Sequence, residues 1–469
     1  MSAFLLDSGV AAPRGEATDA RATRPPCGRR RRASRRFAAW LGAVLLAVTG
    51  AVFGPAARAA EPPVPRLTLE EAEQSALKNH PRISAAQLRA LAAKQVVRET
   101  RAAFFPSLFA DATAVGTAEN NARISAGGLN NPFILERNAE GATLTQLITD
   151  FGRTASLTSS AKSRAVAEQQ NVAATRNQIF LALDTAYFNT LQAQAVLHVA
   201  LQTVGSRQLV LDQIRISATN KLKSELDVSF AAVSLGDAQL LVAKASNDLN
   251  AAWANLADVM GSREARRFAL VEVPMPPGLT NNDSDLIAVA LQQRPDLLQF
   301  RAQRDAAYQY AKAEKRLVLP TISAVGAAGT TPIRDPRMGQ NYAAAGVDLS
   351  LPLFTGGLYA ARRSEAVFRA QEADQQLRDL EDNIIRDVRV ARLNVDYALQ
   401  RMALTEQQLE NAREALDLAT ARLTTGLSSI VELTQAQLNE ISAEVGLANA
   451  KYDYHIQRAI LAYQLGQWS

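Results

Sequence analysis

Cysteine and histidine are scarce in this chain, which has one cysteine and three histidines in 469 residues. The cysteine, Cys27, precedes an apolar segment at residues 37–53, so it cannot be the acylated cysteine of a lipoprotein signal. A chain with no other thiol can form neither an internal disulfide nor a thiolate metal site. The three histidines show no metal-ligand spacing; they are His80, His198 and His455. We therefore expect no metal and no cofactor.

Motifs for catalysis and for nucleic-acid binding are also missing. The sequence has no Gly-x-Ser-x-Gly elbow, no phosphate-binding glycine-rich loop and no nucleotide motif. Aromatic residues make up 6% of the chain, which leaves little surface for stacking on bases. We expect a protein that is not an enzyme and that does not bind nucleic acid.

The positive charge of the chain is concentrated near its start. Residues 1–60 hold ten arginines and three acidic residues, whereas the other 409 residues hold 41 basic and 43 acidic side chains. A basic run at 29–36, the apolar stretch at 37–53 and the small-residue site Ala57-Arg58-Ala59 are typical of an export signal. We predict that residues 1–60 are a signal peptide with a basic N-terminal extension. The alternatives are an uncleaved anchor and a twin-arginine signal at Arg35-Arg36.

No other stretch of the sequence reaches about 18 consecutive apolar residues, so a second transmembrane helix is not expected.

What the sequence does contain is an internal repeat. Two Pro-containing pairs recur 214 residues apart and several glycines recur 205 apart: His80-Pro81 with Arg294-Pro295, Phe105-Pro106 with Leu319-Pro320, Gly152 with Gly357, and Gly261 with Gly466. We predict two structural repeats, at 61–280 and 281–469.

Each repeat has the pattern of a helix, a second helix, a strand, a loop, a strand, a very long helix and a final helix. The very long segments, at about 151–217 and 357–422, contain no proline, and each would extend roughly 100 Å as a helix. With the helices that follow them they define two long coils, at 151–260 and 357–465. Helices of this length suit coiled coils, bundles or tubes better than a compact globule.

Alternation of apolar and polar residues predicts four strands, and the clearest example places Val347, Leu349, Leu351 and Leu353 on one face. The fourth candidate is weaker because Gln146 falls on its apolar face. Polar, Gly- and Asn-rich segments at 117–140 and 330–342 read as loops. Four strands cannot close a barrel, so several copies must contribute if the strands span a membrane. The predicted strands are at about 107–116, 141–149, 320–329 and 343–353.

Short motifs stand in a fixed order along this plan, which extends from Leu67 to Gly466. They are Pro81 and Pro106, Pro295 and Pro320, Asp150-Phe151-Gly152-Arg153, Phe354-Thr355-Gly356-Gly357-Leu358, and the run from Thr425 to Leu433. With these motifs the plan resembles the TolC-like outer-membrane efflux family. The resemblance implies a mainly α fold with a membrane β-barrel, in which a homotrimer forms a 12-stranded barrel continued by an α-helical barrel in the periplasm. It also implies docking to a periplasmic adaptor and an inner-membrane pump.

The resemblance also assigns roles at the two coil tips. The turns fall at Asn220-Lys221 and at Gly426-Leu427, and Lys221 stands where the family has glycine. Because Asn tolerates the left-handed conformation that ends a helix, we expect the first turn to form with a shifted register around Asn220. Family members carry an acidic ring at the periplasmic entrance, and Asp227 and Glu432 occupy those positions.

Three further positions depart from the family pattern at the tips. Gln435 stands where a second acid often occurs, and Leu423 and Ser428 replace the gate Tyr and Arg. A plainer interpretation of Asp227 and Glu432 is that both are acids in the first turn of a helix, where the macrodipole favours them.

The function that this resemblance implies is passive conduction of small molecules exported by a pump and an adaptor. Two alternatives stay open at this point. One is an outer-membrane channel for type I protein secretion, and the other is a periplasmic coiled-coil structural or adaptor protein without a pore.

Overall fold

The computed structural model describes residues 65–116, 136–221, 223–264, 266–279 and 282–468. Residues Pro62–Ser469 form one compact unit. The predicted signal peptide lies outside the described residues, as does most of the first predicted loop.

The first half of the unit contains two short helices, a strand pair and two long helices. A two-residue strand, β1 (Arg66–Leu67), precedes them and pairs in parallel with β4 (Ala269–Leu270). The other elements are α1 (Leu69–Asn79), α2 (Pro81–Ala102), β2 (Ser107–Val115), β3 (Arg137–Thr149), α3 (Arg153–Thr219) and α4 (Glu225–Val259).

The second half repeats this order, with a short 3₁₀ turn at Arg316–Val318 before its strands. The very long helices of the two halves, α3 and α7, have 67 residues each. The elements are α5 (Asp283–Gln293), α6 (Pro295–Lys315), β5 (Thr321–Arg334), β6 (Asn341–Ser350), α7 (Leu358–Thr424) and α8 (Ile430–Leu465).

The duplication extends to the backbone torsion angles. The described residues with positive φ fall into pairs separated by 205 positions, although two members of the first half are not glycine. The two halves thus share the left-handed backbone conformation at matching positions, although residues other than glycine rarely adopt it. The pairs are Phe151 with Gly356, Gly152 with Gly357, Lys221 with Gly426, and Gly261 with Gly466.

Local sequence explains where the helices begin. Pro81 and Pro295 occupy the opening positions of α2 and α6, where the missing N–H of proline costs no helical hydrogen bond. His80 caps α2, because its Nδ1 accepts the Arg82 N–H at 3.2 Å. Thr68 forms a capping box with Glu71 at the start of α1.

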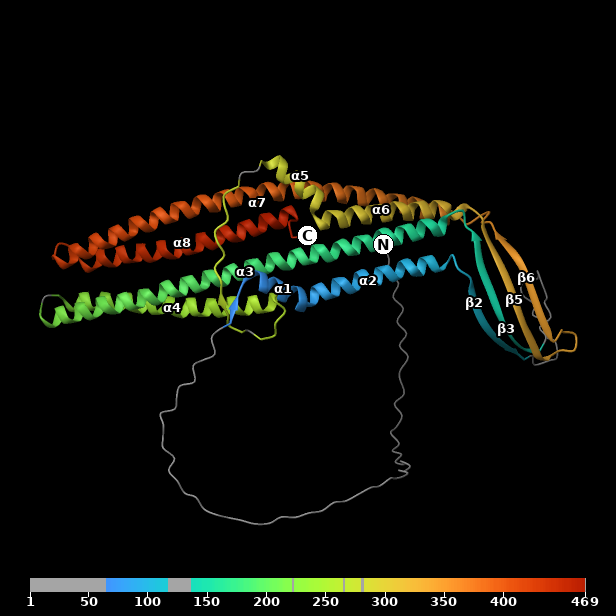
Figure 1. Ribbon diagram of the computed structural model, residues 1–469, viewed down its shortest axis with the longest axis horizontal. Helices are drawn as coiled ribbons and strands as arrows, with labels where there is room; N and C mark the ends of the chain where they lie inside the picture. The colour runs from blue at the N-terminus through green and yellow to red at the C-terminus, as the bar shows by residue number, and fades with distance from the viewer. Residues whose placement is uncertain (1–64, 117–135, 222, 265, 280–281, 469) are drawn as a thin grey trace, which may run out of the picture. The chain divides into compact units, whose positions relative to one another are not determined.

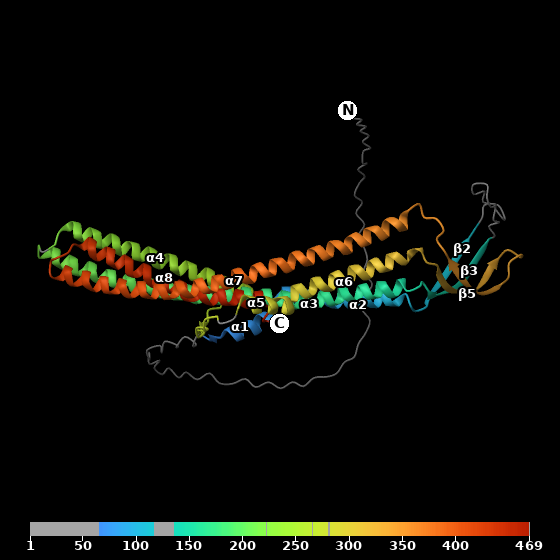
Figure 2. The same ribbon diagram turned by 90° about the horizontal axis from the view of Figure 1, so that it is seen from above.

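The four longer strands form an antiparallel sheet in the order β2-β3-β5-β6. In Figures 1 and 2 this sheet lies at one end of the compact unit, and the turns α3–α4 and α7–α8 lie at the other. A row of paired residues crosses the sheet on one face, consisting of Leu108, Leu144, Gly326 and Ala345. The described residues leave this apolar face uncovered, and Leu108 is 70% exposed.

The strand boundaries correct the sequence-based ones. Residues 137–140, 330–334 and 341–342 pair as strand, although they were expected in loops, because backbone pairing does not require an apolar side chain. At the other end β6 stops at Ser350, so Leu351 and Leu353 lie beyond it. Pro352 has no N–H to give to the ladder, which ends the strand there.

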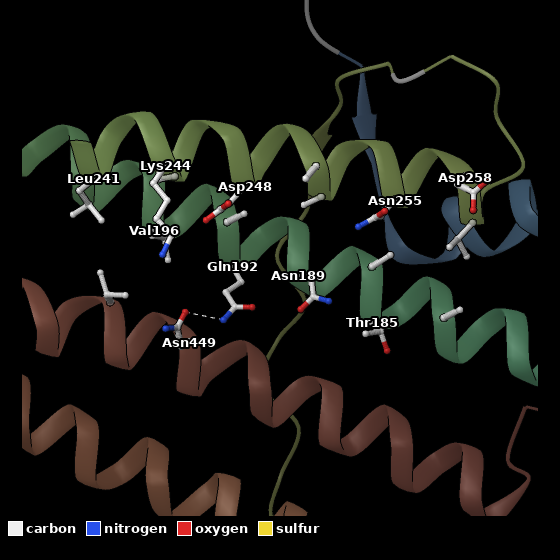
Figure 3. A pocket seen from close by; sticks show the side chains of 18 residues that line it. Thr185, Asn189, Gln192, Val196, Leu241, Lys244, Asp248, Asn255, Asp258 and Asn449 are labelled. Atoms are coloured by element: carbon white, nitrogen blue, oxygen red, sulfur yellow. Dashed lines mark hydrogen bonds between the residues drawn. The ribbon is translucent and has the colours of Figure 1, made fainter. Parts of the chain in front are cut away.

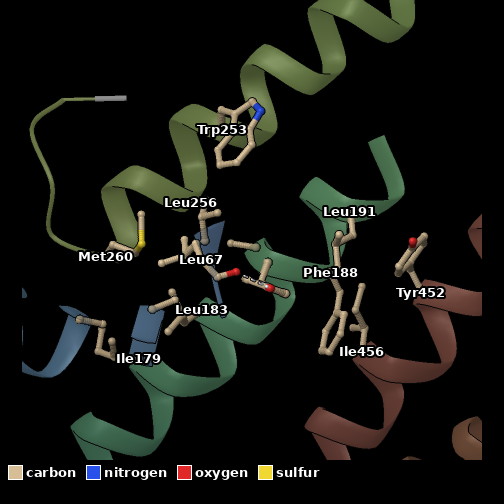
Figure 4. Packing of buried hydrophobic residues seen from close by; sticks show 14 of the residues in the cluster. Leu67, Ile179, Leu183, Phe188, Leu191, Trp253, Leu256, Met260, Tyr452 and Ile456 are labelled. Carbon is tan, nitrogen blue, oxygen red and sulfur yellow. Dashed lines mark hydrogen bonds between the residues drawn. The ribbon is translucent and has the colours of Figure 1, made fainter. Parts of the chain in front are cut away.

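The largest core lies where α1, α3, α4 and α8 meet (Figure 4). Leu183 and Leu256 are fully buried in it, and Phe188 and Ile456 join α3 to α8. The Tyr187 hydroxyl lies 3.0 Å from the Leu67 carbonyl oxygen and 2.8 Å from that of Val271, so it ties the β1–β4 pair to α3.

One described helix, α4, is long and apolar enough to cross a membrane by length and composition alone. One helix that passes by composition is weak evidence for a membrane span, so the expectation that the chain has no second transmembrane helix stays a prediction. That expectation counted unbroken apolar runs, whereas the alanines, leucines and valines of α4 give a high mean hydropathy despite interspersed polar residues. In the structure α4 pairs with α3 in the coil.

Candidate functional site at the coil tips

The two coil tips are held together by one apolar cluster. Side chains from all four long helices meet there, so the α3–α4 hairpin and the α7–α8 hairpin end side by side (Figures 1 and 2). The buried members are Leu211, Ile214, Ala231, Leu235, Ala419, Ile430, Leu433 and Ala436.

The second tip forms a glycine-ended helix terminus. Gly426 has φ of 73°, and its N–H donates to the Leu423 carbonyl oxygen at 3.2 Å. The Leu427 N–H donates to the Arg422 carbonyl oxygen at 2.8 Å, which completes the pattern of a Schellman motif. Nothing lies within 4 Å of where a Cβ on Gly426 would stand, so its left-handed φ is the constraint.

The first tip uses the same backbone geometry without glycine. Lys221 has φ of 58°, and its N–H donates to the Ala218 carbonyl oxygen at 2.9 Å. Asn220 has φ of −83°, so it does not adopt the left-handed conformation. The predicted register shift was therefore wrong, because the turn keeps the position that corresponds to Gly426 and accepts a lysine there.

Asp227 closes a capping box at the start of α4. Its Oδ2 accepts the Ser224 N–H at 3.0 Å and the Ser224 hydroxyl at 2.8 Å, and its own N–H donates to Ser224 Oγ at 3.2 Å. These hydrogen bonds stabilise the carboxylate and hold the pKa of Asp227 below its usual value.

Glu432 occupies the corresponding place at the start of α8. Its N–H donates to Ser429 Oγ at 3.4 Å, and its Oε1 lies 3.4 Å from Nη1 of Arg422 across the turn. Gln435, one turn further on, donates to Asn439 Oδ1 at 3.0 Å. Asp227 therefore caps α4 through its side chain, whereas Glu432 is an acid in the first turn of α8, where the macrodipole favours it.

The two positions that depart from the family's gate are apolar or unpaired in the structure. Leu423 packs against the apolar tip cluster. Ser428 Oγ is buried and has no hydrogen-bond partner among the described residues. Neither side chain forms a described polar link between the hairpins.

The structure also reveals a groove that no sequence motif marked. It has a volume of about 800 Å³ and lies between α3, α4 and α8 (Figure 3). Gln192 Nε2 donates to Asn449 Oδ1 at 2.7 Å across it. Isolated polar residues in a long coil carry no recognisable spacing, so this groove could not be predicted from the sequence.

The histidines serve as helix cap, core and surface residues in the described part of the chain. His80 caps α2. His455 stacks on Phe188 with ring centroids 4.6 Å apart, and burial lowers its pKa. His198 is exposed. Among the described residues no group of three or more His, Cys, Asp or Glu is placed to hold a metal ion.

A sheet with an uncovered apolar face, joined to two 67-residue helices, is the arrangement expected of an outer-membrane channel with a long helical extension. The chain belongs to the outer membrane efflux protein family, whose model matches residues 72–262 and 286–467. One matched segment falls in each half. The family consists of transport proteins, and the chain is an outer-membrane efflux channel protein.

One relative is similar to this chain in sequence, and two solved structures are similar to it in fold. Outer membrane protein TolC of Escherichia coli is 27% identical over 395 residues, which cover 80% of this chain and 77% of that protein. The outer membrane protein VceC of Vibrio cholerae has a TM-score of 0.73 at 20% identity, over 85% of this chain and 96% of that one. The Campylobacter jejuni outer membrane channel CmeC has a TM-score of 0.73 at 17% identity, over 85% of each chain.

These matches do not favour the two alternatives that the sequence left open, a type I protein-secretion channel and a coiled-coil protein without a pore.

Proposed function

We propose that three copies of this chain form one channel, in which twelve strands close a β-barrel and the long helices continue it as a tube. The observation that carries this proposal is the pair of open sheet edges. Within the described residues, β2 and β6 each pair with one strand only. Unpaired backbone groups are costly in hydrocarbon, and about eight strands are the minimum for a filled barrel. Three copies, the number that the family resemblance implies, supply twelve.

The channel conducts small molecules passively from the periplasm to the cell exterior. An inner-membrane pump supplies the energy and selectivity, and a periplasmic adaptor joins the pump to the coil tips. Support for these partners comes from family membership and from the exposed apolar residues at the tips, including Leu226, Leu427 and Val431. Apolar residues exposed close together on a surface favour a protein partner.

At the tips, three copies of Asp227 and three of Glu432 form the periplasmic entrance ring. The two acids stand at equivalent positions of α4 and α8, each three residues past a serine cap, in hairpins that end side by side. If the three-fold axis of the trimer passes close to the coil tips, the three copies of each acid lie around that axis. Like charges gathered at a constriction attract cations.

The proposal is tested with the purified mature protein in detergent and in planar bilayers. Mass photometry is expected to give the mass of three chains, and bilayers are expected to show discrete conductance steps. Expression in a cell that lacks its own channel is expected to restore efflux only when an adaptor and a pump are present. A stable monomer that conducts would overturn the closure argument.

A further inference from the structure

The two faces of the four-stranded sheet differ in polarity. Successive side chains of a strand point to opposite faces, so the strand register assigns each residue to one face. The face that carries Leu108 also carries Ala110, Ala142, Ala328 and Ala343. In the proposed barrel this apolar face meets lipid, so the opposite face lines the channel. That opposite face carries the polar side chains Asp111, Thr143, Thr145, Ser323, Tyr342 and Asp348.

One row of paired residues on the channel face has an acid at one end and a tyrosine at the other. It consists of Asp111 on β2, Gly141 on β3, Gly329 on β5 and Tyr342 on β6. A Cβ on either glycine would clash with the Tyr342 hydroxyl, so the tyrosine side chain extends over both glycines. Its ring therefore lies along the sheet, with the hydroxyl directed toward the strand that pairs with β2.

The Asp111 carboxylate has no positive partner among the described residues. It accepts a hydrogen bond from the Thr143 hydroxyl, which is a neutral donor. Its side chain is exposed in the single chain. A carboxylate on the wall of a channel is therefore free to attract a cation.

Two aromatic side chains share the channel face with this carboxylate. Phe109 precedes Asp111 by two positions on β2 and is 63% exposed. Tyr342 approaches from the other edge of the sheet and is 41% exposed. The faces of aromatic rings attract cations, most strongly where water is partly excluded. A carboxylate with aromatic rings on the same wall suits a cation that also carries apolar groups.

We propose that Asp111, Phe109 and Tyr342 form a binding site for organic cations on the inner wall of the barrel. The carboxylate attracts the positive charge, and the two rings contact the apolar groups around it. The three copies of the chain place three such sites around the channel. The proposal rests on the proposed channel function, because it names a class of molecule that the channel binds in transit.

The test is block of single-channel conductance by tetrabutylammonium, a cation with four apolar arms, in planar bilayers that hold the assembled protein. Wild type is expected to show block that depends on the tetrabutylammonium concentration. Asp111→Asn is expected to weaken this block roughly fivefold, because it removes one unit charge in contact with water. Tyr342→Leu and Phe109→Leu are each expected to weaken it roughly threefold, since each removes one aromatic ring.

Two variants serve as matched controls. Tyr342→Phe keeps the ring and is expected to be blocked as strongly as wild type. Asp348→Asn removes another acid from the same face, six residues further along β6 and thus roughly 20 Å from Tyr342. It is expected to leave the block unchanged. An equal weakening in Asp348→Asn and Asp111→Asn would show a general effect of wall charge and would overturn the site.

The remaining outcomes separate this site from the channel itself. Wild-type protein that never conducts would defeat the proposed function. Conducting wild-type protein that tetrabutylammonium does not block would defeat only the site. Block of equal strength in wild type and Asp111→Asn would place the blocking ion elsewhere, such as at the coil tips, and would also defeat the site. If Tyr342→Leu fails to assemble, the near-isosteric Asp111→Asn variant decides by the same measurement.

Discussion

Lys221 holds a backbone conformation that costs a residue with a Cβ roughly 1 to 2 kcal/mol, whereas glycine adopts it freely. Lys221→Gly is therefore expected to stabilise the first tip. Part of the gain is offset because glycine makes the unfolded chain more flexible, so the net increase is about 0.5 to 1 kcal/mol. Thermal unfolding followed by circular dichroism would show it as a higher melting temperature.

The equivalent position in the second tip provides the opposite change. Gly426→Ala introduces a Cβ at φ of 73° and is expected to lower the melting temperature. The site has open space around it, so a steric clash would not explain the loss. Equal melting temperatures for wild type, Lys221→Gly and Gly426→Ala would show that the tips do not contribute to the measured transition.

Asp184 on α3 is a buried carboxyl group whose Oδ1 has no partner among the described residues. Burial raises its pKa from 3.8 to about 8, and Glu73 on α1 adds to the increase. Between these values the folded chain binds more protons than the unfolded chain, so stability falls as pH rises. The contribution of the neutral carboxyl group to the free energy of unfolding is fully present below pH 3.8 and is lost as the pH rises to about 8.

Asp184→Asn removes this titration. The variant is expected to melt at a higher temperature than wild type at pH 9, with a smaller difference at pH 5, where Asp184 is mostly protonated. Asp212→Asn changes an exposed aspartate on the same helix and serves as the control. If wild type melts at a higher temperature than Asp184→Asn at pH 9, the Asp184 carboxylate has a stabilising partner in the assembled protein.

At the scale of single elements, the sheet depends on glycines beneath Tyr342. A Cβ on Gly329 would clash with the Glu140 carbonyl oxygen and the Tyr342 hydroxyl, and one on Gly141 would clash with the same hydroxyl. The Tyr342 ring thus lies across two neighbouring strands, an arrangement that packs an aromatic ring over glycine.

Gly329→Ala is therefore expected to weaken the pairing of β3, β5 and β6 and to lower the yield of heat-resistant assembled protein. Gly346→Ala is the matched control, because Gly346 lies on β6 on the same face and has nothing within 4 Å of its added Cβ. Gel mobility before and after heating measures the assembled fraction. Similar losses in both variants would point to a general effect of removing glycine from strands.

Much of the element order was predictable because it rests on strong local signals. Pro81 and Pro295 mark helix starts, and the long proline-free segments leave few alternatives to helix. Strand ends were less predictable, since polar residues pair as readily as apolar ones when a neighbouring strand is available. The left-handed conformation of Lys221 was not predicted, because it is imposed by the turn between α3 and α4 and not by the preference of lysine.

The candidate site was only partly predictable for a related reason. Ser224 and Ser429 with acids three residues later are local cap signals, so the places of Asp227 and Glu432 in their helices followed from the sequence. The groove between α3, α4 and α8 has no such signal. Gln192 and Asn449 lie far apart in the sequence, and only the packing of α3 against α8 brings them together.

At the scale of the whole molecule, the capping and ring roles of Asp227 and Glu432 make different predictions. Asp227→Asn combined with Glu432→Gln is expected to weaken cation selectivity and divalent-cation block in bilayer recordings while assembly persists. If the acids act only as helix caps, the double variant loses about 0.3 to 1 kcal/mol of stability per site and its selectivity is unchanged. Glu410→Gln is the control for the general loss of negative charge, because Glu410 is an exposed acid on α7 before its tip end. Conductance steps test whether the protein is a channel, and the reversal potential tests whether the acids form the ring. Equal reversal potentials and equal divalent block in wild type, control and double variant would therefore contradict the ring assignment without contradicting the channel.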